Sequence, residues 1–136
     1  MRPTERLVLD TSAYSHLRAG HVQVLDHVAD AAVVVIPVTV LGELEAGFEL
    51  GHRTQENRRI LAEFLDEPFT SVLDVTATTV RYYARIIASL RRAGTPIPVN
   101  DAWIAASAME CNGHLLTFDR DYRRIIDLDH TLLEAQ

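Results

Sequence analysis

The sequence predicts an α/β domain in which a mainly parallel sheet of four to five strands lies between two layers of helices. Short apolar runs of strand length recur along the chain, and most are followed by amphipathic stretches with helical spacing. Strands that are joined through helices run parallel, and the helices cover both faces of the sheet. The 136 residues suffice for one core, so we expect a single domain over residues 1–136.

Composition narrows the class of protein. With 48% hydrophobic and 24% charged residues the chain is globular, and its net charge of −6 argues against a surface that attracts nucleic acid everywhere. The longest apolar run, residues 31–41, is shorter than the roughly 20 residues of a membrane span. No secretion signal is visible at the N-terminus, and the one cysteine cannot form an internal disulfide. We therefore expect a cytoplasmic protein with no membrane partner.

The first third of the chain predicts a strand, helices and a second strand. The apolar segment "LVL" at 7–9 is a strand, and residues 12–31 carry a helical pattern that we expect to break near Gly20. The β-branched run "VVVIP" at 33–37 is the next strand.

Two helices and a third strand are expected in the middle of the chain. The first helix covers residues 38–51 with Thr39 as its candidate cap, and the second covers residues 54–67. The segment "FTSVLDV" at 69–75 has the composition of a strand.

A long helix follows, with Thr76 as its expected cap and Gly94 as its end. The apolar positions that we expect on its inner face are Val80, Tyr83, Ala84, Ile87 and Leu90.

The last third predicts a buried helix over residues 100–113, with Asn100 as its cap and Gly113 as its terminator. A fourth strand, "HLLTFD", follows at 114–119. The tail at 122–136 holds a short turn or helix and a candidate last strand.

Four acids fall where this fold would bring them together. Asp10 and Asp119 each follow an apolar strand, and ligand sites of α/β sheets lie beyond the carboxyl ends of the strands. Asp101 sits in the first turn of its helix, and Glu43 lies on a partly buried helix face with Gly47 one turn later. Clustered carboxylates need a cation, and Mg²⁺ or Mn²⁺ prefers oxygen ligands.

The chain resembles the PIN domain ribonucleases, and among them the VapC-type toxins of bacterial type II toxin–antitoxin pairs. Four segments in the family's order carry the resemblance across nearly the whole chain: "LVLDTSA", "IPVTVLGELEAG", "IPVNDAWIAASAM" and "LLTFDRDY". The resemblance implies a PIN-like three-layer α/β/α fold.

The resemblance also implies the site residues. The acidic quartet that would bind metal and carry catalysis falls on Asp10, Glu43, Asp101 and Asp119, with Asp121 as an alternative fourth acid. Three hydroxyl residues match supporting positions, namely Thr11, Ser12 and Thr117.

The activity implied is metal-dependent endonucleolytic cleavage of RNA by a water that one or two Mg²⁺ ions activate, with Mn²⁺ as a substitute. Its effect would be to inhibit translation or growth. The implied partners are the RNA substrate, a cognate VapB-type antitoxin and a second copy in a homodimer. We expect Arg81, Arg85 and Arg120 to be candidates for guiding the RNA.

Two other functions of α/β domains do not fit the residues of this chain. A phosphoryl-accepting receiver domain needs a lysine, and all thirteen basic residues here are arginine. A haloacid-dehalogenase-like phosphatase needs a second aspartate where this chain has Ser12. A housekeeping RNA-processing nuclease and a PIN module that binds RNA or protein without turnover stay open as alternatives.

Overall fold

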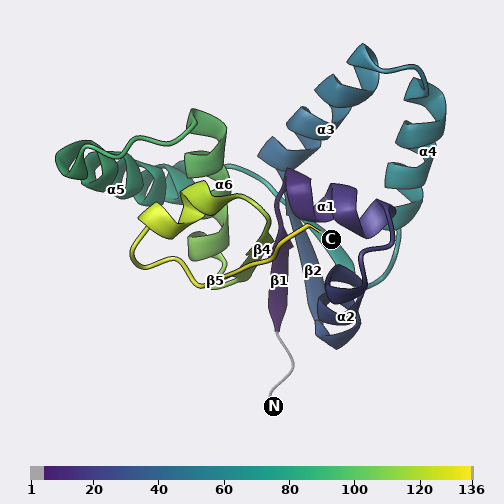
Figure 1. Ribbon diagram of the computed structural model, residues 1–136, viewed down its shortest axis with the longest axis horizontal. Helices are drawn as coiled ribbons and strands as arrows, with labels where there is room; N and C mark the ends of the chain where they lie inside the picture. The colour runs from purple at the N-terminus through teal and green to yellow at the C-terminus, as the bar shows by residue number, and fades with distance from the viewer. Residues whose placement is uncertain (1–4, 136) are drawn as a thin grey trace.

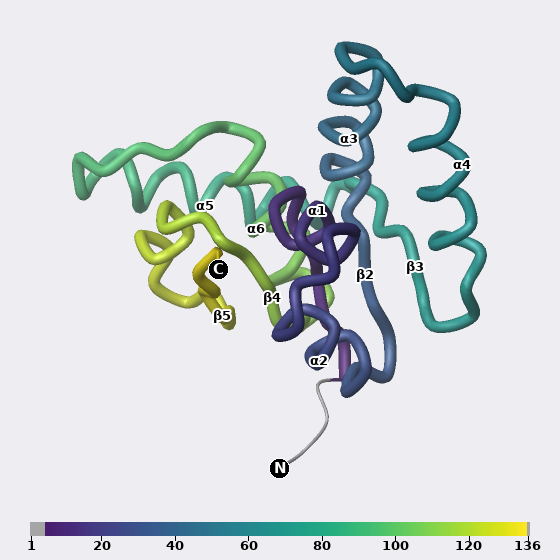
Figure 2. The backbone as a smooth tube through the Cα atoms, turned by 45° about the vertical axis from the view of Figure 1, so that its right-hand side comes forward, coloured from purple at the N-terminus to yellow at the C-terminus, as the bar shows by residue number. Residues whose placement is uncertain are grey.

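The structure is a computed structural model that describes residues 5–135. Within these residues, five parallel strands form one sheet in the order β3-β2-β1-β4-β5 (Figure 2). The strands are β1 (Arg6–Leu9), β2 (Val33–Pro37), β3 (Thr70–Leu73), β4 (His114–Thr117) and β5 (His130–Leu132). The expected parallel sheet, including the candidate last strand, is confirmed.

In the described part of the chain, six α-helices and one 3₁₀ helix connect the strands: α1 (Thr11–Arg18), α2 (Val22–Asp30), α3 (Val38–Leu50), α4 (Thr54–Leu65), α5 (Ala77–Ala93), α6 (Val99–Glu110) and η1 (Arg120–Arg124). From β1 to β3 the chain moves across the sheet in one direction, and from β3 to β4 it returns. Right-handed crossovers then place α1 and α2 on one face and α5 and α6 on the other. The three-layer α/β/α fold is confirmed.

The two central strands form the middle of the core. Leu7, Val8, Leu9, Leu115 and Leu116 are fully buried, because helices cover both faces of β1 and β4. α1 packs on these two strands, and α6 packs on β2 and β4 from the opposite side. A sheet buried on both faces explains why these strands are apolar at nearly every position rather than at every second one.

Two predicted helix caps are wrong. α3 begins at Val38 and α6 at Val99, so Thr39 and Asn100 lie inside their first turns. The residue before each helix is a proline with extended backbone angles, φ −60° and ψ 144° at Pro37 and φ −55° and ψ 143° at Pro98. Proline fixes φ at a value that suits a helix entry, so the chain turns into the helix without a side-chain cap.

The ends of α5 are as predicted, and its buried face is so in part: Leu90 is buried, and Tyr83 and Ile87 pack against the core, whereas Val80 and Ala84 are exposed. Thr76 is the N-cap, in a reciprocal pair of hydrogen bonds with Thr79, and Gly94 ends the helix with φ 71°. Thr79 is fully buried and donates to the Glu110 carboxylate of α6, which leaves Val80 47% exposed. A polar contact between two helices therefore sets the rotation of α5, and apolar spacing alone could not indicate it.

The turn after α6 also differs from the prediction. Gly113 was expected to terminate the helix, but α6 ends at Glu110, and Asn112, with φ 53°, takes the left-handed conformation after it. Gly113 is needed for a close approach instead, since a Cβ atom there would lie 2.5 Å from Cγ2 of Val8. The absence of a side chain lets the start of β4 lie directly beside β1.

The α3–α4 hairpin rises beyond the carboxyl ends of the strands (Figure 1). Arg58 of α4 forms ion pairs with Glu45 and Glu49 of α3, which join the two helices. Glu43 lies at the base of this hairpin, one residue before the buried Leu44. Within residues 5–135, no helix combines the length and apolar character that crossing a membrane requires.

Candidate metal centre

The sheet brings the two strand-end acids together. β1 and β4 are parallel neighbours in which Leu9 pairs with Leu116, so both strands end at the same edge. Asp10 directly follows β1, and its backbone N–H donates to the carbonyl of Leu116 at 3.4 Å. Asp119 follows β4 after one intervening residue and contributes to the electrostatic environment of Asp10. The parallel register of β1 and β4 therefore explains why Asp10 and Asp119 lie close together.

Hydrogen bonds hold the Asp10 carboxylate on both of its oxygens. Oδ1 accepts from the Ser12 hydroxyl at 2.7 Å and from the backbone N–H of Ala13 at 2.8 Å, which caps α1. Oδ2 accepts from the Thr117 hydroxyl at 2.5 Å. Asp10 is only 4% exposed, and burial raises its pKa despite these donors. Its position is therefore fixed by the neighbouring strand as well as by its own helix.

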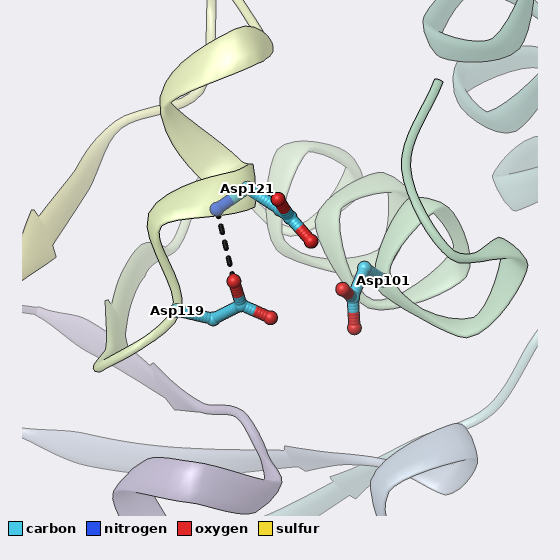
Figure 3. Close-up of side chains that lie close together, drawn as sticks. All are labelled: Asp101, Asp119 and Asp121. Atoms are coloured by element: carbon cyan, nitrogen blue, oxygen red, sulfur yellow. Dashed lines mark hydrogen bonds between the residues drawn. The ribbon is translucent and has the colours of Figure 1, made fainter. Parts of the chain in front are cut away.

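Three further carboxylates surround one small volume. One oxygen each from Asp101, Asp119 and Asp121 lies within 4.8 Å of the others. Figure 3 shows Asp101 on its helix facing the two aspartates of the adjoining turn. Asp119 accepts from the backbone N–H of Asp121 at 2.9 Å, which fixes the first turn of η1. The three residues thus come from two neighbouring elements: Asp101 from α6, and Asp119 and Asp121 from the start of η1.

Glu43 lies outside this group of three but beside it. The Thr11 hydroxyl donates to its Oε1 at 2.6 Å, and the Asn100 amide donates to its Oε2 at 3.4 Å. Thr11 belongs to α1 and Asn100 to α6, so the carboxylate is held between two elements of the site edge. The charge of Glu43 is one cause of the raised pKa of Asp101, which places it within electrostatic reach of the cluster.

The electrostatics of the cluster are strongly unfavourable to further negative charge. Burial, the neighbouring Asp119 carboxylate and then Glu43 raise the pKa of Asp101 to about 7, while a hydrogen bond from Tyr122 acts in the opposite direction. The charges of Asp10, Asp101, Asp119 and Glu43 all raise the pKa of the Tyr122 hydroxyl, after burial as the first cause. The charges of all four predicted acids therefore act on the hydroxyl of one tyrosine, so the four carboxylates lie within electrostatic reach of the same point.

Two residues of this site were missed from the sequence. Asn100 was interpreted as a helix cap, and in the structure its side chain contacts Glu43. Tyr122 is 1% exposed, and its hydroxyl donates to Oδ1 of Asp101 at 3.3 Å. The only signal for Tyr122 was its place directly after the two candidate acids, because its direction depends on the 3₁₀ turn that follows β4.

The two candidates for the fourth acid differ in their surroundings. Arg124 lies 3.4 Å from Oδ1 of Asp121 and partly neutralises it. Among the described residues this is the one ion pair that involves any of the five acids Asp10, Glu43, Asp101, Asp119 and Asp121. Asp119 therefore carries the less compensated charge of the two.

The structure places the candidate RNA-guiding arginines at different sites. Arg120 is exposed and directly follows Asp119. Arg85 lies over the ring of Tyr82 at 5.4 Å and lines a hollow of about 170 Å³ to which none of the five acids contributes. Arg81 is exposed on α5, one turn before Arg85. Of the three, Arg120 is the one that adjoins the acids.

The donor set fits a hard divalent cation. The groups that converge are carboxylate oxygens with almost no basic counter-charge, and oxygen is the ligand that Mg²⁺ and Mn²⁺ prefer. A divalent cation would relieve the repulsion that raises the pKa of Asp101.

The chain matches known proteins along most of its length. The model of the PIN domain family matches residues 7–128. Ribonuclease VapC5 of Mycobacterium tuberculosis is 30% identical over 115 residues, which cover 85% of this chain and 84% of the relative. Ribonuclease VapC4 of the same organism is 29% identical over 94 residues, which cover 69% of this chain and 72% of the relative.

Solved structures share the fold. The structure of VapBC2 from Rickettsia felis, bound to a DNA fragment from its promoter, has a chain with a TM-score of 0.84 and 22% identity, and the match covers 95% of this chain and 99% of that one. VapBC-5 from M. tuberculosis gives a TM-score of 0.68 at 25% identity, covering 96% and 98%. The extent of the family match and the conserved course of the chain lead to one conclusion: this protein belongs to the PIN domain family, with VapC proteins among its relatives.

Proposed function

We propose that this protein is a metal-dependent endoribonuclease that acts as the toxin of a toxin–antitoxin pair. The observation that carries the proposal is the cluster of Asp101, Asp119 and Asp121 at the carboxyl edge of the sheet, with Asp10 and Glu43 beside it. The names of the relatives VapC4 and VapC5 as ribonucleases agree with this chemistry.

The residues that would hold the metal are Asp10, Glu43, Asp101 and Asp119, with Asp121 as a further ligand. One or two Mg²⁺ ions, or Mn²⁺ in their place, would lower the pKa of a bound water and stabilise negative charge on the phosphate. Asp119 is the preferred fourth acid, because Asp121 already forms an ion pair with Arg124.

The chain's own residues keep these carboxylates in place. Thr117 and Ser12 orient Asp10, Thr11 and Asn100 orient Glu43, and Tyr122 orients Asp101. Hydrogen bonds from fixed neighbours reduce the reorganisation that metal binding would otherwise require.

Arg120 is the residue that we expect to contact an RNA phosphate, because it is exposed next to Asp119. Arg81 and Arg85 on α5 would contact more distant phosphates of the RNA, because Arg85 lines a hollow apart from the acids. A few arginines near the acids suit a protein with a net charge of −6, because they attract phosphate only near the site.

The biological setting is also part of the proposal. Complexes named VapBC are among the structures with this fold, so we expect a VapB-type antitoxin to hold the protein inactive. We further expect residues 1–136 to form one domain, two copies to associate, and the protein to act in the cytoplasm on cellular RNA, with inhibition of translation or growth as the effect.

The direct test is cleavage of total cellular RNA by the purified chain, free of any partner, in Mg²⁺, in Mn²⁺ and in EDTA. Asp101→Asn is compared with Asp26→Asn, a matched change at an exposed aspartate of α2. We expect discrete new 5′ ends that need metal and Asp101 and do not need Asp26. A folded, metal-loaded wild type that leaves all RNA intact, or cleavage that survives Asp101→Asn, would contradict the proposal.

A further inference from the structure

A hollow of about 360 Å³ opens in the surface, and it is lined by the chain neighbours of Asp119 but by none of the five acids. Phe118 and Arg120, the two neighbours of Asp119 in the chain, form one side of it. The other side consists of the last residues that the structure describes, namely Leu132, Leu133, Glu134 and Ala135. Its volume lies within the range of about 300–1,000 Å³ that is usual for small-molecule sites.

The Phe118 ring is held in a fixed orientation. His16 stacks on one of its faces, with ring centroids 3.8 Å apart and planes at 14°. His21 meets the ring edge-on at 5.1 Å and 79°. Phe118 is half-buried and lines the hollow, so the part of its ring that His16 does not cover is available to a flat ligand. A side chain that is already stacked loses little freedom when it binds a second ring.

Hydrogen bonds through Ser12 connect His16 and Phe118 to Asp10. A ring nitrogen of His16 bonds to the backbone carbonyl of Ser12 at 2.8 Å, and the backbone N–H of Phe118 donates to the Ser12 hydroxyl at 3.0 Å. The same hydroxyl donates to Asp10 at 2.7 Å. A ligand stacked on Phe118 would therefore sit at a fixed position relative to the acids.

We propose that this hollow is a nucleobase subsite, in which a base next to the cleaved phosphate stacks on Phe118. The proposal rests on the proposed function and adds to it the way in which single-stranded RNA is gripped. Leu132 and Leu133 provide an apolar wall for the base, and Arg120 at the rim pairs with the phosphate of the same nucleotide. The negative charge of Glu134 disfavours a phosphate inside the hollow, so the base enters and the phosphate stays at Arg120.

The test is nuclear magnetic resonance of the full chain without metal, titrated with AMP, CMP, GMP and UMP and, separately, with ribose 5-phosphate. The nucleotides are expected to shift the methyl signals of Leu132 and Leu133 and the ring signals of Phe118, whereas ribose 5-phosphate, which has no base, leaves them in place. Equal shifts from ribose 5-phosphate would overturn the proposal, because the site would then bind phosphate alone.

Variants separate stacking from charge. Phe118→Leu keeps an apolar side chain against His16 and is expected to weaken nucleotide binding about five- to a hundredfold, the range for loss of a base–aromatic stack. Phe69→Leu is the control. Phe69 directly precedes β3, the edge strand at the opposite end of the sheet from β5, and this variant is expected to bind nucleotides as the wild type does. If Phe118→Leu does not fold, Arg120→Gln at an exposed position decides: it should weaken binding of the nucleotides severalfold, and unchanged binding would overturn the phosphate contact.

Nucleotide binding does not need cleavage, so the two proposals can fail separately. An active nuclease whose hollow ignores all four nucleotides would refute the subsite alone. A chain that binds nucleotides at Phe118 but cleaves no RNA would keep the subsite and refute the proposed function.

Discussion

Thr117 connects the two strand-end acids of the site through a single hydroxyl group. It is fully buried, donates to Oδ2 of Asp10 at 2.5 Å and accepts from the backbone N–H of Asp119 at 3.0 Å. The sequence indicated a hydroxyl two residues before Asp119, but its reach to Asp10 follows from the pairing of β1 with β4. At this scale the residue types of the site could be predicted, whereas their partners could not.

Thr117→Val should destabilise the fold and impair the site together. Valine has the same shape but leaves a buried carboxylate oxygen and a backbone N–H without their partner, at a cost of about 1–3 kcal/mol. Thr117→Ser keeps the hydroxyl and loses one methyl, at about 1 kcal/mol. Chemical denaturation and RNA cleavage measured on both variants check this. If valine and serine reduced cleavage equally, the hydrogen bond would have no part in orienting Asp10.

The elements of this protein were predictable where the pattern is local. Five strands and their order of alternation with helices follow from apolar runs, and Thr76 and Gly94 mark the ends of α5. The starts of α3 and α6 were misplaced because prolines replace side-chain caps there. The inner face of α5 was misplaced in part because the contact of Thr79 with α6 is tertiary. The same reason explains why the contacts of Tyr122 with Asp101 and of Asn100 with Glu43 were not predicted.

Gly113 gives a test at the level of elements. Gly113→Ala would put a methyl group 2.5 Å from Cγ2 of Val8 in the core strand β1 and should destabilise the fold by about 1–3 kcal/mol. Gly42→Ala is the matched control, because no heavy atom lies within 4 Å of its added Cβ and it stands inside α3. That change should stabilise the protein by about 0.5–1 kcal/mol. Free energies of unfolding that are equal for the two variants would contradict the close approach at Gly113.

The whole molecule concentrates acidic side chains at one edge of its sheet, and this should be visible in its stability. The pKa of Asp101 is about 7 in the folded chain, against an ordinary value near 3.9 in the unfolded chain. Between these values the folded chain binds more protons than the unfolded chain, so this group's contribution to stability is lost as the pH rises. Burial of Asp10 raises its pKa and acts in the same direction.

Comparison of Asp101→Asn with the wild type isolates this contribution. Asparagine resembles the protonated acid, so the Tm difference between variant and wild type, in EDTA, should be small near pH 4 and grow in favour of the variant up to about pH 7. Added Mg²⁺ should raise the Tm of the wild type at the higher pH and leave that of the variant nearly unchanged. A Tm difference that does not vary with pH would show that Asp101 ionises as an ordinary carboxyl.

Mn²⁺ binding to the metal-free protein, followed by electron paramagnetic resonance, tests most directly whether the converging carboxylates bind a divalent cation. We predict saturable binding of one or two ions by the wild type and by Asp26→Asn, and binding at least about tenfold weaker in Asp101→Asn, consistent with loss of a charged ligand from an oxygen site. Equal Mn²⁺ affinity in the wild type and in Asp101→Asn, with both proteins folded, would contradict the account.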